Sequence, residues 1–475
     1  MSRVKVADVF NQITQKPDES VVDMQLKTEL KKLEKKIIVL DDDPTGVQTV
    51  HDISVYTDWE TDSIRKGFLE ENSMFFILTN SRGFTEAQTI KAHKEIAERI
   101  CKIAKETQKE FLVISRGDST LRGHYPLETE VLKDTIEENS AIHYDGEILF
   151  PFFKEGGRFT VNNVHYVQYE EELVPAGETE FAKDRTFGYH SSNLAEWAEE
   201  KTNGRFKADK AVSITLEELR AVDIEKITEK LKSVERFNKV IVNAVDYSDV
   251  KVFVIALVRA MNDGKQFLFR SAAALTKIIG GVSDQPLLTK EALLTKDNRN
   301  GGLIVIGSHV QKTTDQLQAL QELEDVKFVE FKVHLVLEED KFAEEQKRVQ
   351  DEVNKSILSG KTVAVYTERE RLDLGENKKE EELLLSVKIS NAVTEIVKQL
   401  KTRPKFIIAK GGITSSDIGT NGLGVKQAVV AGQIAPGIPV WYTGEDSRFP
   451  RLPYIIFPGN VGTNYTLKEI VAQLK

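Results

Sequence analysis

Cysteine is almost absent from this sequence of 475 residues, in which Cys101 is the only one. No intramolecular disulfide and no cysteine-based metal site can therefore form. An excess of basic residues is also missing, because 65 Lys and Arg residues face 75 Asp and Glu residues and leave a net charge of −10. This balance disfavours nucleic acid as the main partner, since phosphate binding needs a clustered basic surface.

Long apolar runs are missing as well. Nowhere do 18 apolar residues follow one another, so we expect no membrane-spanning helix. The first residues, MSRVKVADVFNQITQKPDE, contain no continuous apolar segment of the kind that a signal peptide has. We therefore expect a cytoplasmic protein with no membrane partner.

Two common nucleotide-binding signatures do not occur. The chain contains no G-x-x-x-x-G-K-[ST] P-loop, and no G-x-G-x-x-G opens its first predicted strand–helix unit. These absences disfavour a standard P-loop NTPase and a Rossmann dehydrogenase.

Short apolar runs alternate with longer amphipathic segments along most of the chain, which predicts an α/β fold. The polar, glycine-rich stretch 280–302 separates two such series. We predict two domains, each a largely parallel sheet flanked by helices, with a cleft between them. The predicted bounds are 1–35 for an N-terminal helical extension, 36–285 for the first domain and 300–475 for the second.

In the first domain, charged side chains follow the predicted strands at the points where these end. The stretch KIIVLDDDPTG, residues 36–46, places three aspartates directly after a buried strand, and such carboxylates need a cation or a polar ligand nearby. Residues that can hold a carboxylate with two hydrogen bonds are Arg82, Arg116, Arg122 and Arg158. Acceptors suited to sugar hydroxyls are Asp42, Asp43 and Asp118. Together these residues predict a site for a small polyhydroxylated acid.

Several of these side chains also have a structural interpretation. Asp41 alternatively caps the turn that follows it, and Asp118 alternatively caps the next predicted helix. Arg116 and Arg122 alternatively pair with surface acids. His165 has no second ligand at metal-binding spacing, so its sequence context indicates a structural or substrate-contacting role instead of a metal site.

In the second domain, glycines stand three times between a predicted strand and a predicted helix. The segments are VIGSHVQKTTDQL, IIAKGGITSSDIG and FPGNVGTNYTL. Glycines let backbone N–H groups approach a phosphate, and hydroxyl groups and a helix N-terminus complete the binding site. An acid-binding domain followed by a nucleotide-binding domain suggests phosphoryl transfer to a hydroxyl, which requires a base or positioning carboxylate and Mg²⁺ on the β,γ-phosphates.

The sequence resembles the four-carbon acid sugar kinases, a group long known only as a domain of unknown function. The resemblance covers nearly the whole chain from about Lys36 onward. It depends on ordered motifs: DDDPTG (41–46), RGDSTLRGH (116–124), EGGRFTVNNVHYV (155–167), GSHVQKTTDQL (307–317), KGGITSSDIG (410–419), IAPGIPVW (434–441) and PGNVG (458–462).

The resemblance implies that the first domain binds an acid such as threonate, erythronate or 3-oxo-tetronate, and that the second binds ATP with Mg²⁺. We expect the acid to be bound by Arg82, Arg116, Ser119, Arg122, Gly157, Arg158 and His165. We expect ATP to be bound by Ser308, Lys410, Gly411, Gly412, Thr414, Gly459 and Gly462. The residues that would hold a metal are not identified, and a homodimer is a further expectation.

In the mechanism that we expect, Asp42, Asp43 or Asp118 orients and deprotonates the attacking hydroxyl. Arg122 or Arg158 holds the carboxylate of the acid. Lys410 either neutralises phosphate charge or is a surface residue. One departure from the family pattern is Ile413, which stands where members usually carry an acidic residue between the glycine pair and the threonine. If that acid organises Mg²⁺ or the ribose, its task must pass to another residue here.

Two rival functions remain at this point. A strand followed by Asp41-x-Asp43-Pro-Thr resembles the first motif of haloacid-dehalogenase-type phosphohydrolases, in which the first aspartate accepts the phosphoryl group. However, no acidic pair follows a later strand as that mechanism requires. A sugar-acid sensor without catalytic activity would explain the arginines but not the three glycine segments.

Overall fold

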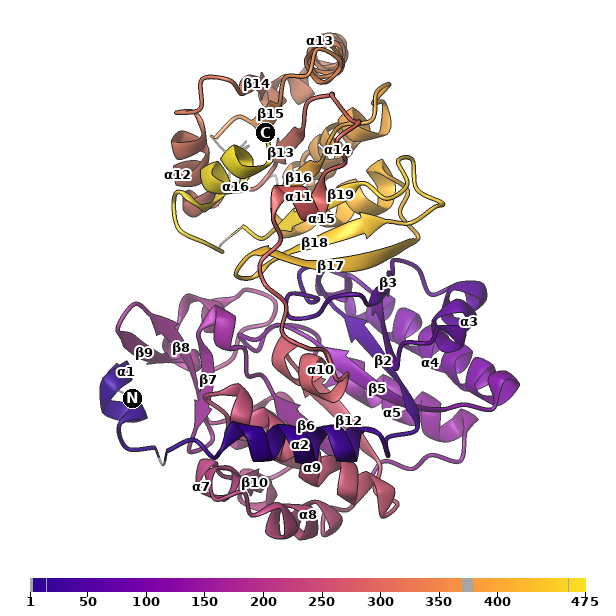
Figure 1. Ribbon diagram of the computed structural model, residues 1–475, viewed down its shortest axis with the longest axis vertical. Coiled ribbons are helices and arrows are strands. Elements are labelled where there is room, and N and C mark those ends of the chain that lie inside the picture. Colours follow the sequence, from indigo (N-terminus) through magenta and orange to yellow (C-terminus); the bar gives the residue numbers. More distant parts are fainter. Residues whose placement is uncertain (1–2, 14, 370–378, 460) are drawn as a thin grey trace. The chain divides into compact units, whose positions relative to one another are not determined.

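The computed structural model describes residues 3–13, 15–369, 379–459 and 461–475. The chain forms two compact units, the first made of Met1–Val50 and Asp58–Asp284 and the second of His51–Thr57 and Gln285–Lys475. Each unit is an α/β structure with a mostly parallel sheet flanked by helices, which confirms the predicted fold class (Figure 1). The segment His51–Thr57 belongs to the second unit, although it lies within the predicted first domain.

The first unit is built on a parallel sheet with the strand order β10-β11-β6-β12-β5-β2-β4. Strands β2 and β4 are buried almost throughout, which explains why they appear in the sequence as continuous apolar runs. The bounds of these strands are β2 Lys35–Asp41, β4 Met74–Leu78, β5 Glu110–Arg116, β6 Gly146–Phe150, β10 Val212–Ile214, β11 Asn238–Val242 and β12 Phe267–Ser271.

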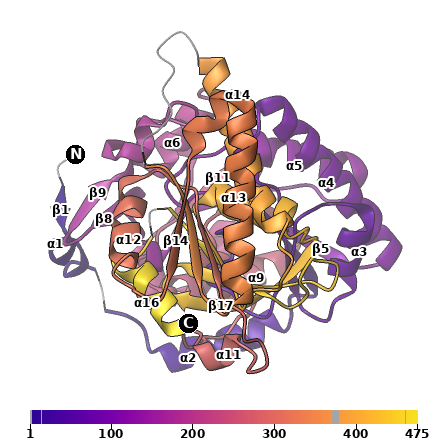
Figure 2. The ribbon, with the colours of Figure 1, turned by 90° about the horizontal axis from the view of Figure 1, so that it is seen from above.

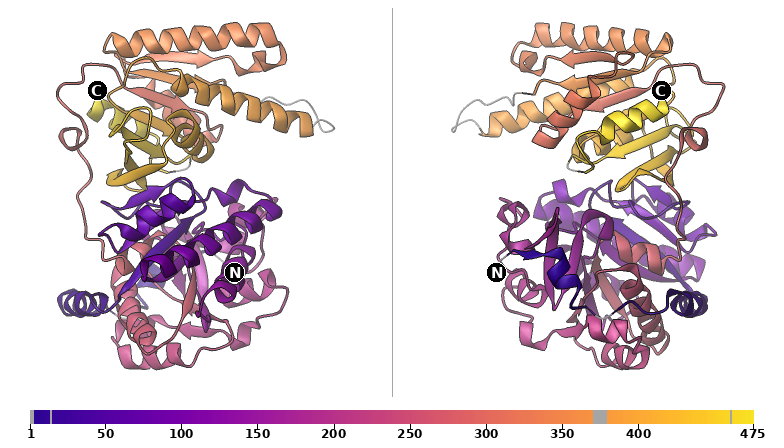
Figure 3. Two further views of the ribbon diagram at one scale, coloured as in Figure 1. Left: turned by 90° about the vertical axis from the view of Figure 1, so that its right-hand side faces the viewer. Right: turned by 60° about the vertical axis from the view of Figure 1, so that its left-hand side comes forward.

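Helices connect these strands and cover the sheet. The two long ones, α4 and α9, both begin at a capping box, formed by Thr85 with Gln88 and by Asp246 with Asp249. The bounds are α2 Glu19–Leu30, α3 Thr61–Leu69, α4 Glu86–Thr107, α5 Leu127–Asn139, α6 Leu194–Lys201, α7 Leu216–Arg220, α8 Ile224–Lys232, α9 Tyr247–Asn262 and α10 Ala273–Ile279. Helix α2, from the N-terminal extension, packs on α9 at the outside of this unit (Figure 3).

A small antiparallel sheet with the order β1-β9-β8-β7 is inserted between β6 and β10 (Figure 1). Its strands are β1 Val4–Lys5, β7 Arg158–Val161, β8 Val164–Tyr169 and β9 Glu172–Pro175. The N-terminal extension supplies β1, which pairs with β9, and then the short helix α1 Val6–Phe10. The extension therefore contains a strand in addition to helices.

The second unit contains a sheet in which β19, β16, β13, β15 and β14 are parallel, followed on one side by the antiparallel strands β18, β17 and β3. Strand β3 brings His51–Thr57 into this unit by pairing with β17. The bounds are β3 Ser54–Tyr56, β13 Leu303–Ile306, β14 Lys327–Phe331, β15 Val363–Thr367, β16 Ile407–Lys410, β17 Gln427–Ala435, β18 Ile438–Thr443 and β19 Pro453–Phe457.

Helices lie on both faces of this second sheet. Figure 2 shows α12 and α16 on one side of β14 and the long helix α13 on the other. The bounds are α11 Lys290–Leu293, α12 Gln311–Leu320, α13 Glu339–Leu358, α14 Lys379–Lys398, α15 Gly412–Asp417 and α16 Thr466–Leu474. Within the described residues, no helix combines the length and the apolar character needed to cross a membrane.

Candidate functional site

In the first unit, the charged residues singled out from the sequence gather at the carboxyl edge of the parallel sheet. The neighbouring strands β4, β2 and β5 end there, at Leu78, Asp41 and Arg116. Parallel strands expose all their carboxyl ends at one edge, so the segments after them lie close together. The three aspartates and the arginines are therefore neighbours in the structure.

Arg82 pairs with two of the three aspartates. Its Nε and Nη2 donate to the two carboxylate oxygens of Asp42 at 3.2 and 2.7 Å, and its Nη1 donates to Asp43 Oδ2 at 3.2 Å. Asp43 Oδ1 also accepts from the backbone N–H and the hydroxyl of Thr45, at 2.8 and 2.5 Å. Burial opposes ionisation of Asp43, but Arg82 and Thr45 outweigh it and lower the pKa of this carboxyl. Both oxygens of Asp42, and both of Asp43, are thus already engaged.

Asp41 points into the interior of the unit and is 1% exposed. Arg116 Nη1 donates to Asp41 Oδ1 at 3.2 Å, and a Cβ atom on Gly46 would overlap the Asp41 carboxylate. Burial is the main reason why the pKa of Asp41 rises to about 7, although Arg116 opposes the shift. A phosphate-accepting nucleophile must be reachable by its substrate, so this burial argues against the phosphohydrolase interpretation.

Asp118 lies in the loop after β5 and keeps one oxygen available. Its Oδ2 accepts from Arg122 Nε at 2.7 Å and from the hydroxyl of Thr120, whereas its Oδ1 accepts no hydrogen bond from the described residues. Burial alone would raise the pKa of Asp118, but the charges of Arg122 and Arg82 have the larger effect and lower it. The carboxyl therefore stays ionised at low pH. Asp118 does not cap the next helix, because the residue before α5 is Pro126 and no side chain caps that helix.

Two arginines share one aromatic ring beside Asp118. The guanidinium of Arg122 lies 5.0 Å from the centre of the Phe181 ring, and that of Arg158 lies 5.8 Å from it. Burial lowers the pKa of Arg158, and Arg122 adds to this effect while Asp118 opposes it. Among the described residues, Arg158 forms no ion pair, and its Nε is buried without a hydrogen-bond partner. Such a cation fits an anionic ligand that approaches Asp118 and Arg122.

His165 and Gly157 support this region from within the inserted sheet. His165 is fully buried, and its two ring nitrogens are within hydrogen-bond distance of Thr160 Oγ1, at 2.9 Å, and of the Ser119 carbonyl, at 2.8 Å. Both nitrogens being engaged, His165 holds the backbone of Ser119 in place and does not present a free group to a ligand. Gly157, just before Arg158, has φ +71°; its N–H donates to the Lys154 carbonyl, and its carbonyl accepts from the Gln168 N–H.

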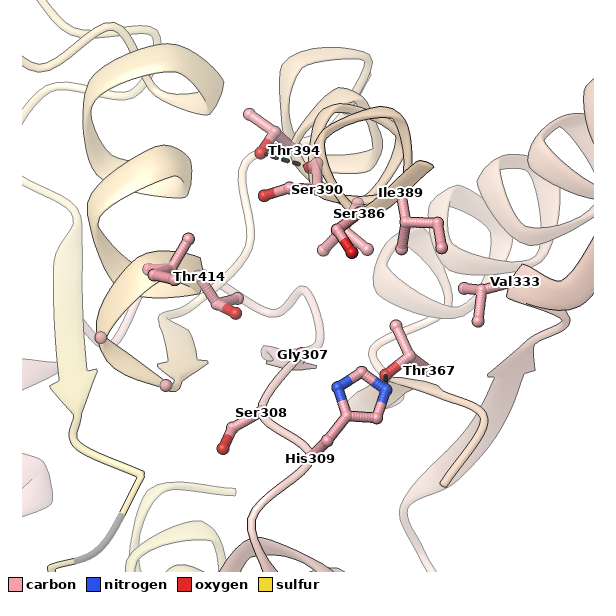
Figure 4. Close-up of a pocket in the computed structure, with 14 residues that line it drawn as sticks. Gly307, Ser308, His309, Val333, Thr367, Ser386, Ile389, Ser390, Thr394 and Thr414 are labelled. Atoms are coloured by element: carbon pink, nitrogen blue, oxygen red, sulfur yellow. Dashed lines mark hydrogen bonds between the residues drawn. The ribbon is translucent and has the colours of Figure 1, made fainter. Parts of the chain in front are cut away.

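In the second unit, the glycine segments after β13 and β16 line a pocket of about 410 Å³ (Figure 4). Figure 4 shows the hydroxyls of Ser308 and Thr414 at one end and residues of α14 at the other. The lining residues are Gly307, Ser308, His309, Val333, Thr367, Ser386, Ile389, Ser390, Val393, Thr394, Gly411, Gly412, Ile413 and Thr414. The size falls in the range of small-molecule and cofactor sites.

The close approach of two loops explains the glycines of this pocket. Gly411 has φ +120°, and a Cβ atom there would lie 3.0 Å from Ser308 Cβ. A Cβ atom on Gly307 would overlap the Thr414 hydroxyl. Gly459, from the third segment, lies next to Ser308, and Thr313 donates to its carbonyl at 3.2 Å. The three segments therefore meet around the Ser308 hydroxyl.

Lys410 is buried and is not a surface residue. Its ammonium group donates to the carbonyls of Pro458 and Gly459 at 2.6 and 3.2 Å, and burial lowers its pKa to about 7. It does not line the pocket. Its two hydrogen bonds connect the second glycine segment with the third. Gly462 follows at φ +81°, and its carbonyl accepts from Lys312 at 3.0 Å.

Three residues near these sites are not among those predicted from the sequence. Phe181 lies between β9 and α6, Arg270 lies inside strand β12, and Arg369 follows β15. Arg369 donates to the Ser308 carbonyl at 2.6 Å and to Thr314 Oγ1 at 3.0 Å. An arginine near the end of a parallel strand was a usable signal for Arg270, whereas nothing in the sequence marks Phe181.

The described residues contain no group of three or more His, Cys, Asp or Glu side chains that could hold a metal ion. The carboxylates of Asp41, Asp42, Asp43 and Asp118 are paired with arginines instead. The described pocket lining of the second unit offers hydroxyl oxygens.

Two parts of the chain match models of known protein families. Residues 37–279 match a sugar-binding N-terminal domain, and residues 303–467 match a nucleotide-binding C-terminal domain. A search of curated proteins found no match.

Solved structures share the fold of this chain. A Haemophilus influenzae protein of the DUF1537 family is 19% identical, with 92% of this chain and 99% of that one covered and a TM-score of 0.61. A Salmonella typhimurium LT2 protein that carries a provisional description as a tRNA synthase is 15% identical, with 92% and 98% covered and a TM-score of 0.64. At these identities the likeness concerns the fold alone.

Proposed function

Because this chain belongs to the four-carbon acid sugar kinase family, with its sugar-binding and nucleotide-binding domains, we propose that it transfers the γ-phosphoryl group of ATP to a hydroxyl of a small sugar acid. The first unit binds the acid and the second binds ATP.

The observation that carries this proposal is the arrangement of Asp118, Arg122 and Arg158. The Arg158 guanidinium lacks an ionic partner among the described residues and is partly buried, so a ligand carboxylate would replace the solvation that it has lost. Asp118 Oδ1 is a free acceptor in the same region. A cation for a carboxylate beside an acceptor for a hydroxyl is the recognition pattern of a hydroxy acid.

Asp118 is the carboxylate that we assign to the reacting hydroxyl. Asp42 and Asp43 have both oxygens engaged by Arg82 and Thr45, and Asp118 alone of the three keeps a free oxygen within the described structure. Its lowered pKa makes it a weak base. This suits phosphoryl transfer, in which the transition state is loose and the carboxylate mainly orients the attacking oxygen.

The pocket of the second unit provides two kinds of surface for ATP. Ile389, Val393 and Val333 form an apolar part, suited to a purine ring, and the Ser308 and Thr414 hydroxyls stand near the glycine backbone, suited to phosphates. Mg²⁺ usually reaches such sites on the phosphates of the nucleotide, and these two hydroxyls are the side-chain oxygens best placed to assist it. When bound, the ion would neutralise charge on the β- and γ-phosphates.

The test is ADP release, measured by a coupled assay, with Mg²⁺, ATP and a panel of four- and five-carbon sugar acids. Turnover that depends on one acid would support the proposal and identify the substrate. ATP binding without turnover of any acid would contradict it and favour a sensor. Release of phosphate from phosphate esters would favour the phosphohydrolase alternative.

A further inference from the structure

Arg270 is a buried cation at the carboxyl edge of the first sheet. It belongs to β12, which lies between β5 and β6, and its register partners are Ser115 and Leu149. Its side chain is 6% exposed. A charge in this position is costly unless it is compensated by neighbouring groups, so its contacts indicate its purpose.

The loop after β5 leaves space for this guanidinium at two glycines. A Cβ atom on Gly117 would overlap the Arg270 guanidinium, and a Cβ atom on Gly123 would lie 2.9 Å from its Nη2. Gly123 also has φ +122°, which other residues rarely adopt. The loop 117–123, which contains Asp118 and Arg122, is therefore wrapped around the Arg270 side chain.

Arg270 connects this loop with the one after β4. Its Nη2 donates to the Arg122 carbonyl at 2.7 Å, and its Nη1 lies 3.9 Å from Glu128 Oε2. Glu128 Oε1 accepts from Ser81 Oγ at 2.6 Å, next to Arg82. Burial raises the pKa of Asp42, and the charges of Arg82 and then Arg270 oppose this rise.

We propose that Arg270 is a positioning residue for acid binding: it fixes the loop 117–123 so that Asp118 and Arg122 keep the geometry that a sugar acid requires. This inference rests on the proposed function. The side chain of Arg270 is 6% exposed, so in this proposal Arg270 acts on the acid through the loop. A displacement of the loop by about 1 Å would be enough to reduce the rate by about a hundredfold.

The experiment measures steady-state kinetics of the protein with ATP and threonate, or with the best acid of the panel. We expect Arg270→Ala to lower kcat/KM for the acid by about a hundredfold while the KM for ATP stays within about twofold. Guanidinium chloride at about 20 mM should raise the kcat/KM of this variant for the acid at least about tenfold, compared with the same concentration of KCl. The reason is that the ion fits the space that the side chain leaves. A residue that only stabilised the fold would not give this selective rescue.

Two further variants make the test specific. Gly117→Ala should cause a similar loss, because its methyl group takes the place of the guanidinium, and added guanidinium should not restore it. Arg205→Ala is the matched control, since Arg205 is 56% exposed and pairs with Glu130 on the surface of the same unit. It should behave like the wild-type protein.

The outcomes separate the two proposals. If the wild-type protein phosphorylates an acid and the KM for the acid and the kcat of Arg270→Ala stay within about twofold of the wild-type values, the proposed role of Arg270 is overturned. The proposed function is not affected by that result. Failure of the wild-type protein to phosphorylate any acid would overturn the proposed function, and the role of Arg270 with it. If Arg270→Ala does not fold, Arg270→Lys is tested in its place. Lysine keeps the charge but lacks the planar donors, so we expect the KM for the acid to rise about tenfold. An unchanged KM would overturn the proposal.

Discussion

Replacement of Arg158 by methionine isolates the contribution of one charge to acid binding. Methionine keeps most of the apolar stem of arginine, but it removes the guanidinium, which lies 5.8 Å from the centre of the Phe181 ring. Because Arg158 forms no ion pair among the described residues, the substitution leaves no carboxylate of the protein without its partner. Its effect on folding should therefore be small.

The expected loss follows from the hydrogen bonds that the guanidinium would make. A hydrogen bond between charged groups contributes about 1.5–3 kcal/mol, which corresponds to a rise of roughly 10- to 150-fold in the KM for the acid. The lost cation–π contact costs only about 0.5–1 kcal/mol of stability. The KM for ATP should not change, because the predicted nucleotide pocket lies in the second unit.

The assay is ADP release with either the acid or ATP as the varied substrate, accompanied by a thermal melt of each protein. Arg185→Met serves as the control, because Arg185 is an exposed arginine of the same unit. The reasoning would be refuted by an Arg158→Met variant that keeps the wild-type KM for the acid, or one in which both KM values rise equally.

Three other substitutions probe the remaining parts of the site. Asp118→Asn should lower kcat by at least about a hundredfold with little change in the KM for ATP, and near-normal turnover would exclude Asp118 as the orienting carboxylate. Gly411→Ala should raise the KM for ATP about tenfold or more, because the methyl group would lie 3.0 Å from Ser308 Cβ, whereas Gly424→Ala, also at positive φ but with no neighbour within 4 Å, should not. For Asp41, the folded-state pKa of about 7 lies above the ordinary value of 3.8 for an aspartate, so its contribution to stability is fully present below about pH 4 and is lost as the pH rises to about 7. Denaturant unfolding from pH 4 to pH 8 should therefore show Asp41→Asn gaining stability relative to the wild-type protein as the pH rises, and a constant difference would contradict the assigned burial effect.

The N-terminal extension provides a prediction of its own. Phe10 packs edge-on against Phe159 at 5.3 Å between ring centres, and Phe159 is adjacent to Arg158 in β7. Strand β1 adds the backbone pairing with β9. Phe10→Ala should therefore raise the KM for the acid a few-fold, since an aromatic pair contributes about 1 kcal/mol, and leave the KM for ATP unchanged. Equal kinetics of variant and wild type would show that the extension does not support the acid site.

Local patterns in the sequence determined much of this protein. The apolar runs that became β2, β4 and β13 had to be buried strands, and the segments after them had to lie at the carboxyl edges of their sheets. The glycines at 307 and 411 already indicated a close approach of backbone segments. These features depend on residues that are near one another in the chain, so spacing alone reveals them.

The tertiary structure alone decided how the charges pair. The sequence offered several aspartates and arginines at one edge, but only packing shows that Arg82 engages Asp42 and Asp43, that Arg116 turns inward to Asp41, and that Arg158 Nε has no hydrogen-bond partner among the described residues. Arg270 reaches the carbonyl of a residue 148 positions away in the sequence. Such contacts depend on the order of strands in the sheet and on the space left by glycines in distant loops, and neither is encoded in local periodicity.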